Sequence, residues 1–141
     1  MNIKWAYLAG FLDGDGSIYV RIKPNKTYKF NFQISPSIVF FQSKKVIEKI
    51  EKLQKQYQIG YLRIRKDNII EWIIGDELNI RLLLKNIMPF VRLKKAQDKL
   101  MLEILNDKKK IKDKDDFIKV AKKIEQFKDL NYSKKRKIRI Y

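Results

Sequence analysis

The sequence predicts an α+β protein in which a four-stranded antiparallel sheet carries helices on one face. Two pairs of segments alternate between polar and apolar residues, as half-buried strands do, and helical periodicity precedes, separates and follows the pairs. A chain of 141 residues with 45% hydrophobic residues is also long enough to bury a core. We therefore expect the order αββαββα, followed by further helices, in a single domain covering residues 1–141.

The first expected helix runs from Trp5 to Leu12 and ends at Gly14 or Gly16. Small residues fall on one of its faces, at Ala6, Gly10 and Gly14 with Ala9 beside them. Such a stripe allows a second backbone to approach closely. It therefore predicts a two-fold interface between two copies of the chain, formed by Ala6, Ala9, Gly10 and Asp13.

The first strand pair is expected at residues 17–23 and 29–41, joined by a turn at residues 24–27. Odd-numbered positions are mostly polar and even-numbered positions apolar, which predicts one face on the core and one face open. Pro36 interrupts the second strand, so we expect a sheet edge or a bulge there.

Ser43 is placed to cap a helix whose apolar face contains Val46, Ile47, Ile50, Leu53 and Tyr57. The second strand pair is expected at residues 61–65 and 69–74, around a turn at residues 66–68. Asp76 is expected to cap a third helix that ends near Met88.

A further helix is expected at residues 93–105, followed by a charged linker at residues 106–114. Asp115 or Asp116 is expected to cap the last helix, whose inward residues would be Phe117, Val120, Ala121, Ile124 and Phe127. Residues 132–141 form a basic C-terminal tail.

The charge of the chain points to a polyanionic partner. Lys and Arg number 33 against 16 Asp and Glu, which gives a net charge of +17. A lysine-rich coding bias would be the alternative source of this excess. The sequence contains no long apolar run and no signal peptide, so we expect an intracellular protein, in cytoplasm, nucleoid or organelle, with no membrane partner.

The sequence contains neither Cys nor His. This excludes disulfides, Cys/His zinc sites and nucleases that use a histidine base. Any metal must bind to oxygen ligands, which favours Mg²⁺ or a similar divalent cation. Asp13 and Asp15 stand at the negative end of the first helix, where a cation would relieve the electrostatic conflict.

Leu8-Ala9-Gly10-Phe11-Leu12-Asp13-Gly14-Asp15-Gly16 resembles the signature of the LAGLIDADG homing endonucleases, with Phe11 and Gly14 as variants. Further landmarks follow in the order typical of the single-motif, homodimeric I-CreI-type members of that family: Ser17-Ile18, Ile22-Lys23-Pro24-Asn25, Tyr28-Lys29-Phe30, Gln42, Gly60-Tyr61, Pro89-Phe90 and Leu93-Lys94. The resemblance implies a saddle-shaped sheet and a homodimeric, intron-encoded DNA endonuclease.

The resemblance also implies roles for individual residues. Asp15 would be the metal ligand, joined by the backbone carbonyl of Gly14, Gln42 would orient the attacking water, and Lys94 would stabilise developing charge. Asp13 would be a structural group at the helix end. The family's basic residue four positions after the glutamine is Val46 here, and Lys45 or Lys49 is the candidate replacement.

The open face of the sheet carries side chains of the kinds that read base edges in the major groove. These are Tyr19, Arg21, Lys23, Asn31, Gln33, Arg63, Arg65 and Glu71, with Val39 and Ile73 available to thymine methyls and with Asn25 and Tyr28 added at the turn. A hairpin arm of roughly ten residues at ~3.3 Å each spans about 30 Å. At ~3.4 Å per base step this covers nine or ten base pairs, so a dimer would cover about twenty.

Two alternatives remain open from the sequence. The same family includes RNA maturases, which would add an RNA contact. A basic nucleic-acid binding protein without catalysis would use the same charge, and Asp15 would then only end a helix.

Overall fold

The computed structural model describes residues 2–131, and the expected succession of helices and strands is present. The tail at residues 132–141 lies outside the described residues. The elements in chain order are α1 (Ile3–Asp15), β1 (Gly16–Pro24), β2 (Phe32–Ser43), the 3₁₀ segment η1 (Lys44–Val46), α2 (Ile47–Tyr57), β3 (Tyr61–Ile64), β4 (Ile69–Ile74), α3 (Glu77–Ile87), α4 (Lys95–Lys108), α5 (Lys114–Glu125) and α6 (Phe127–Leu130).

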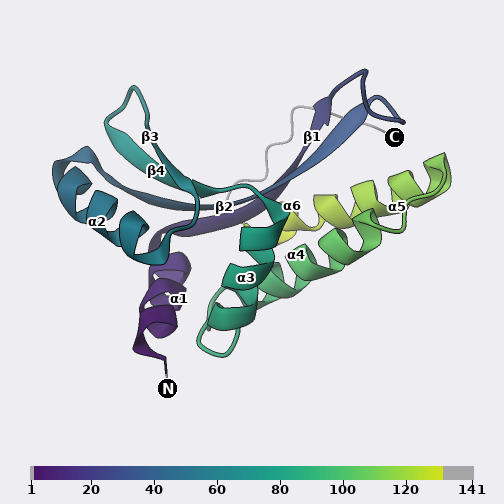
Figure 1. Cartoon of the computed structure of the whole chain (residues 1–141). Helices are drawn as coiled ribbons and strands as arrows, with labels where there is room; N and C mark the ends of the chain where they lie inside the picture. Colours follow the sequence, from purple (N-terminus) through teal and green to yellow (C-terminus); the bar gives the residue numbers. More distant parts are fainter. Residues whose placement is uncertain (1, 132–141) are drawn as a thin grey trace.

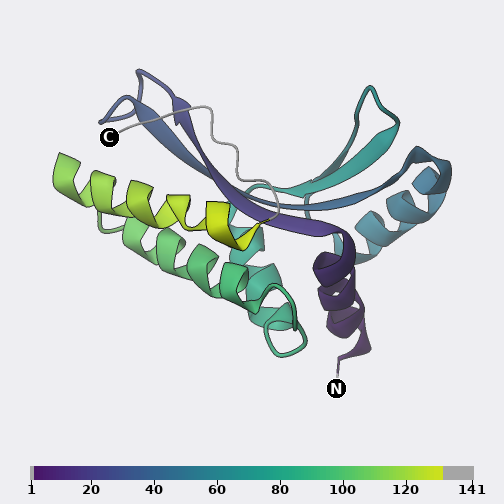
Figure 2. The ribbon, with the colours of Figure 1, turned by 180° about the vertical axis from the view of Figure 1, so that it is seen from behind.

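The strands form one antiparallel sheet in the order β1-β2-β4-β3. The helices lie on one side of this sheet, and the opposite side is curved and open between two raised hairpins (Figure 1). The same arrangement is visible from behind, where α5 runs along the β1–β2 hairpin and α2 lies beside β3 and β4 (Figure 2). The predicted saddle with helices on one face is therefore confirmed.

The alternation predicted from the sequence is also confirmed. Even-numbered strand residues such as Ile18, Ile38 and Trp72 are at most 1% exposed and belong to the core. Odd-numbered residues face one another on the open side, where Lys23 pairs with Gln33 and Arg63 with Glu71. The open face therefore presents the polar side chains as a continuous surface.

The turn between β1 and β2 is longer than predicted. The segment Lys29–Asn31 was expected to begin the second strand, but it belongs to a turn closed by hydrogen bonds from Asn25 N to Asn31 O at 2.8 Å and from Asn31 N to Tyr28 O at 2.9 Å. Asn31 has a φ of 65°, a conformation that asparagine tolerates better than most residues. The prediction that Asn31 lies on a strand is therefore wrong, because turn chemistry outweighs the alternating pattern.

Pro36 occupies an edge-like stretch of β2. Pairing with β1 extends from Phe32 to Phe40, whereas pairing with β4 begins only at Ile38. The missing N–H of Pro36 therefore falls where β2 has a partner strand on one side, and the register with β1 runs through it without a bulge.

The later helices differ from the prediction at their ends. The helix expected at residues 93–105 is α4, which begins at Lys95 and continues to Lys108. Asp113, rather than Asp115 or Asp116, caps α5, since its side chain accepts a hydrogen bond from Asp116 N at 2.8 Å. Asp115 and Asp116 then lie in the first turn, where the helix dipole favours negative charge.

The other predicted caps are confirmed. The Ser43 side chain accepts from Lys45 N at the start of η1, and Asp76 accepts from Asn79 N at the start of α3. The core is one cluster that extends from Leu8 in α1 to Phe127 in α6. Within residues 2–131, none of the helices has the length and apolar character needed to span a membrane.

Candidate functional site

Asp15 is brought next to Gln42 at the point where α1 meets the sheet. Gly16 leads the chain directly from α1 into β1. A Cβ added there would overlap Leu12 Cδ1 and lie 2.8 Å from the Leu12 backbone, so the position requires glycine. Gln42 Nε2 donates to Asp15 Oδ2 at 3.1 Å, and Asp15 is exposed. Two residues that the sequence singled out separately therefore share one solvent-facing site.

Lys94 is fixed at the same end of α1. Its Nζ donates to the backbone oxygen of Asp13 at 3.1 Å, which places a positive charge at the negative end of the helix. The Asp13 carboxylate in turn accepts hydrogen bonds from Arg92 N at 2.8 Å and from Lys94 N at 3.1 Å. Asp13 therefore joins the segment before α4 to α1, which agrees with a structural role at the helix end.

A buried carboxyl that sequence reasoning did not identify lies one helical turn after Lys94. Asp98 is 0% exposed, and neither of its side-chain oxygens has a hydrogen-bond partner among the described residues. Burial, together with the negative charge of Asp13, raises the pKa of Asp98 to about 7, although Lys95 acts in the opposite direction. An acidic residue in the first turn of a helix is common on the surface, so the sequence carried no sign of its burial.

The oxygen ligands at this site suit a hard divalent cation. Asp15 offers an exposed carboxylate whose Oδ2 accepts from Gln42, and the adjacent Gly14 is exposed at the end of α1, with open space where a Cβ would be. In the described part of the chain no three His, Cys, Asp or Glu residues lie close enough together to hold a metal. A cation held here would therefore draw its further ligands from a second copy of the site, from DNA or from water.

The basic residue expected near Gln42 has no clear replacement. Val46 is half-buried at the end of η1, and both Lys45 and Lys49 are exposed nearby on η1 and α2. Neither lysine forms an ion pair with Asp15 in residues 2–131.

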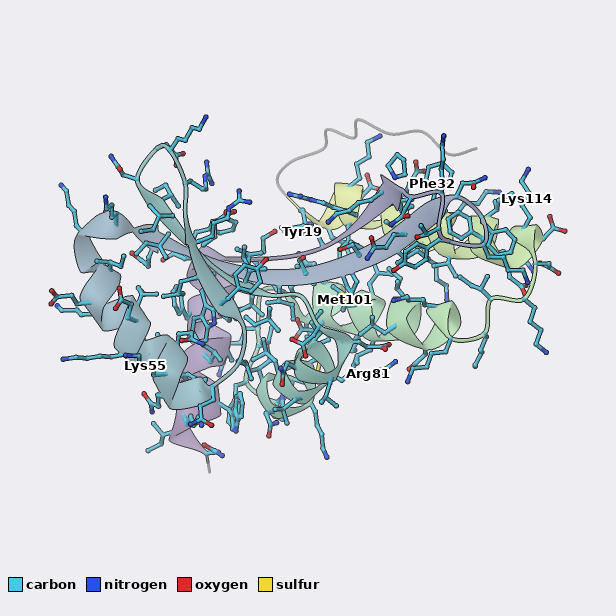
Figure 3. All side chains as sticks on the ribbon, turned by 45° about the horizontal axis from the view of Figure 1, so that its top comes forward. Tyr19, Phe32, Lys55, Arg81, Met101 and Lys114 are labelled. Atoms are coloured by element: carbon cyan, nitrogen blue, oxygen red, sulfur yellow. The ribbon has the colours of Figure 1, made fainter. Side chains whose placement is uncertain are left out.

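The open face of the sheet contains pairs that hold its side chains in place. The Arg21 guanidinium lies 5.2 Å from the centroid of the Tyr19 ring, and Figure 3 shows Tyr19 on the open side. Arg63 Nε forms an ion pair with Glu71 Oε1 at 3.0 Å. The Arg63 side chain remains 64% exposed, so it is available to a ligand on this face.

Three predicted residues of this surface differ from expectation. Val39 lies on the open face in register with Ser17 and Ile73, but it is 0% exposed, so the expected contact with thymine methyls is wrong for Val39. Arg65 follows β3 in the turn and pairs with Asp67 at 2.6 Å, and Asn31 lies in the other turn.

An exposed stripe runs along α1. Ile3 is 79% and Tyr7 57% exposed, and added Cβ atoms at Gly10 and Gly14 would meet nothing within 4 Å. Ala9 is 0% exposed and packs into the core, so its assignment to an interface between copies is wrong. The exposure of Ile3 and Tyr7 was not predicted, because the stripe of small residues marked only the glycine and alanine positions of this helix.

Comparisons with known proteins agree with these features. The model of the family described as "LAGLIDADG endonuclease" matches residues 8–91. The chain is 36% identical over 143 aligned residues to DNA endonuclease I-CreI of Chlamydomonas reinhardtii, covering 97% of this chain and 87% of that protein. It is 32% identical over 112 residues to DNA endonuclease I-CvuI of Chlorella vulgaris, covering 79% of this chain and 70% of that protein.

The fold matches solved structures equally well. The homing endonuclease I-CvuI, in complex with the I-CreI target in the presence of Mg and with the DNA not cleaved, superposes with a TM-score of 0.89 at 31% identity over 96% of this chain and 87% of that one. The archaeal intron-encoded homing endonuclease I-Vdi141I, complexed with DNA, gives a TM-score of 0.83 at 19% identity over 97% of this chain and 89% of that one, which supports the fold alone.

Proposed function

The chain belongs to the LAGLIDADG endonuclease family, and from this premise we propose that it is a site-specific DNA homing endonuclease. Acting as a dimer, it makes a double-strand break in a long, pseudo-palindromic target by metal-dependent phosphodiester hydrolysis. The observation that carries the proposal is the contact between Asp15 and Gln42 at the junction of α1 with an open, polar sheet face.

The metal site is proposed at the end of α1. Asp15 and the carbonyl of Gly14 would hold Mg²⁺ or a similar divalent cation, because both are hard oxygen donors. When bound, such a cation supplies an activated water and stabilises charge on the phosphate oxygens. Gln42, whose amide already donates to Asp15, is placed to orient a water next to that carboxylate.

Lys94 contributes a positive charge close to the same point. Its ammonium is held against the Asp13 carbonyl, so it is positioned before any substrate arrives. A preorganised charge stabilises the developing negative charge of a phosphoryl group more strongly than a mobile one does. Lys45 or Lys49, both exposed near Val46, is the proposed replacement for the family's additional basic residue.

The open sheet face is the proposed DNA-reading surface. Arg and Lys suit guanine, Asn and Gln suit adenine, and Glu suits cytosine, while Ile73 can contact thymine methyls. The half-exposed and exposed positions of this surface, with its two turns, are Tyr19, Arg21, Lys23, Asn25, Tyr28, Asn31, Gln33, Arg63, Arg65, Glu71 and Ile73. The net charge of +17 adds affinity for phosphates that does not depend on sequence.

A second copy of the chain completes the enzyme. One protomer brings a single Asp15, whereas cutting both strands requires two hydrolytic sites. The stripe formed by Ile3, Tyr7, Gly10 and Gly14 can pack against its own copy about a two-fold axis, which would bring the two Asp15 residues close together. Because the substrate is genomic DNA, we place the protein inside the cell, in cytoplasm, nucleoid or organelle.

The experiment that tests this function is a cleavage selection. The purified protein is incubated with Mg²⁺ and a library of long randomised duplexes, and the cut molecules are sequenced. We expect double-strand breaks at the centre of a pseudo-palindrome of about twenty base pairs, the length that two sheets of this size can cover. Tight binding without cutting would favour a non-catalytic binding protein. No observation on this chain favours the RNA maturase alternative.

A further inference from the structure

The two hairpins of the saddle are supported differently. Figures 1 and 2 show that α5 runs along the β1–β2 hairpin, while the turn of the β3–β4 hairpin rises free of the helices. The β3–β4 turn is closed by its own backbone hydrogen bonds and the Arg65–Asp67 pair at 2.6 Å, and Lys44 N donates to Asn68 O at 2.9 Å from the end of β2. The support of the β1–β2 hairpin has consequences for how it contacts a ligand.

The first support is an aromatic cluster. Phe117 of α5 is 7% exposed, and its ring centroid lies 5.7 Å from that of Phe30 and 6.1 Å from that of Phe32. Phe32 and Phe117 are stacked, with 25° between their ring planes. Figure 3 shows Phe32 on the β1–β2 hairpin, on the same side of the molecule as Lys114 at the start of α5. Ring pairs of this kind fix both distance and orientation.

The second support ties the turn to the loop before α5. Lys29 Nζ donates to the backbone oxygen of Lys112 at 3.1 Å. That loop is itself held in place, because Asp116 Oδ2 accepts from Lys112 N at 3.1 Å and Asp113 caps the helix. The turn is therefore attached at two points to an element that contributes no residue to the proposed reading surface.

The turn is also ordered internally. The Asn25 carboxamide oxygen accepts from Thr27 N at 3.1 Å and from Thr27 Oγ1 at 2.7 Å, as in an Asx turn. Asn25 and Tyr28 are therefore presented in a defined arrangement, and Lys23 and Gln33 face each other directly below the turn.

We infer that Phe117 and Lys29 are positioning residues that determine base preference at the outer end of each half-site. The inference rests on the proposed function. β1 leads away from Asp15 for 9 residues, and at ~3.3 Å per residue its end lies about 30 Å, or roughly nine base pairs, from the centre of the target. Movement of the turn by about 1 Å would disturb hydrogen bonds to bases there and leave inner contacts intact.

The first test compares Phe117→Leu with Val120→Ala. Both shorten a buried apolar side chain of α5, but Phe117 is the one whose ring pairs with the rings of Phe30 and Phe32. Cleavage-specificity profiles are measured on a randomised library, with thermal unfolding as a check on folding. We expect Phe117→Leu to reduce discrimination three- to tenfold at the outer positions and to leave the inner positions unchanged. Val120→Ala should keep the wild-type profile at all positions.

The second test uses two exposed lysines of the same turn. Lys29→Met and Lys26→Met each remove one positive charge near the DNA, but only Lys29 is bonded to the α4–α5 loop. Neither change removes a buried side chain, and Lys29→Met also removes the contact of the ammonium with the Phe30 ring, 5.5 Å from its centroid. We expect Lys29→Met to reduce the discrimination between bases at the outer positions of each half-site. Lys26→Met should weaken binding to all DNA sequences alike.

The inference is overturned if the wild-type protein is selective and Phe117→Leu and Lys29→Met leave its specificity profile unchanged. It is also overturned if the two variants reduce base discrimination equally at every position of the target. A wild-type protein that cuts or binds without any base preference would instead contradict the proposed function, and the inference with it.

Discussion

At the scale of single residues, several carboxyl groups and one ammonium group lie at the end of α1, and their charges are only partly neutralised. The Asp13 carboxylate accepts from two backbone N–H groups, the Asp15 carboxylate accepts from Gln42, and Lys94 Nζ donates to the Asp13 carbonyl. Asp98 is buried beneath them without a hydrogen-bond partner in the described chain. A buried carboxyl of this kind lowers stability whenever it is ionised.

Asp98 should therefore make folding stability depend on pH. The folded protein holds the Asp98 proton up to about pH 7, whereas the unfolded chain releases it near pH 4. Stability consequently falls as the pH rises through this window and stays low above it. Asp98→Asn should raise the free energy of unfolding at pH 8 by up to about 4 kcal/mol and leave it nearly unchanged at pH 4.

Chemical denaturation at the two pH values measures this effect. The exposed Glu51 provides the control, because Glu51→Gln makes the same change from carboxyl to amide without burial. An equal gain at both pH values, or a loss at pH 8, would show that Asp98 is not a buried acid.

At the scale of elements, the strands were predictable and the turns were not. Alternation placed Arg21, Gln33 and Arg63 on the open face, because side chains on a strand can only point to one face or the other. Lys29–Asn31 continued the same alternation but folded into the turn, since Asn25 and Asn31 offered local hydrogen bonds that compete with the ladder.

The candidate site was predictable in part for the same reason. Asp15 ends the helix that the nine-residue motif marks, whereas Gln42, near the end of β2, was predicted from the resemblance to the family. Which side of a helix faces the core decides the burial of Asp98 and Ala9 and the exposure of Ile3 and Tyr7. The neighbours that decide this come from distant parts of the chain, so one sequence does not reveal them.

Arg63 provides the element-scale prediction. Its guanidinium is exposed and oriented by Glu71, so it can form a bidentate contact with a guanine. Arg63→Ala should cost about 1–3 kcal/mol and relax the preference at one base position in each half-site. The measurement is a cleavage profile on a randomised target library.

Lys109 is the matched control for Arg63, since it is exposed in the linker after α4 and far from the sheet face in sequence. Lys109→Ala should weaken binding to every DNA sequence alike. It should also reduce the slope of log K against log salt concentration by about one unit for each phosphate that the lysine neutralises. If Arg63→Ala behaves like Lys109→Ala, Arg63 contacts only the DNA backbone.

At the scale of the whole molecule, activity should require two copies. In one protomer, a Cβ added at Gly10 would meet open space, so leucine there should not disturb the fold of the monomer. Replacing a glycine inside a helix also favours the helical conformation. In a dimer packed through α1, the same leucine overfills the contact, typically at ~1–3 kcal/mol or more. Gly10→Leu should therefore lose the dimer and double-strand cutting while it keeps its fold.

Sedimentation and circular dichroism measure assembly and folding separately. Gly75, which also has open space at its Cβ, is the control position, and Gly75→Leu should remain dimeric. The two-fold arrangement would be refuted by a wild-type protein that stays monomeric even on target DNA.

The central claim is that the carboxylate at the end of α1 performs metal-dependent hydrolysis of DNA, and Asp15→Asn tests it most directly. Cleavage and binding are measured on the same selected target with Mg²⁺, beside the wild type and the exposed control Asp115→Asn. We expect Asp15→Asn to cut neither strand while its affinity for DNA stays within about tenfold, because removing a carboxylate near phosphates relieves repulsion. A variant that cuts both strands at close to the wild-type rate would contradict the assignment of Asp15 as the metal ligand.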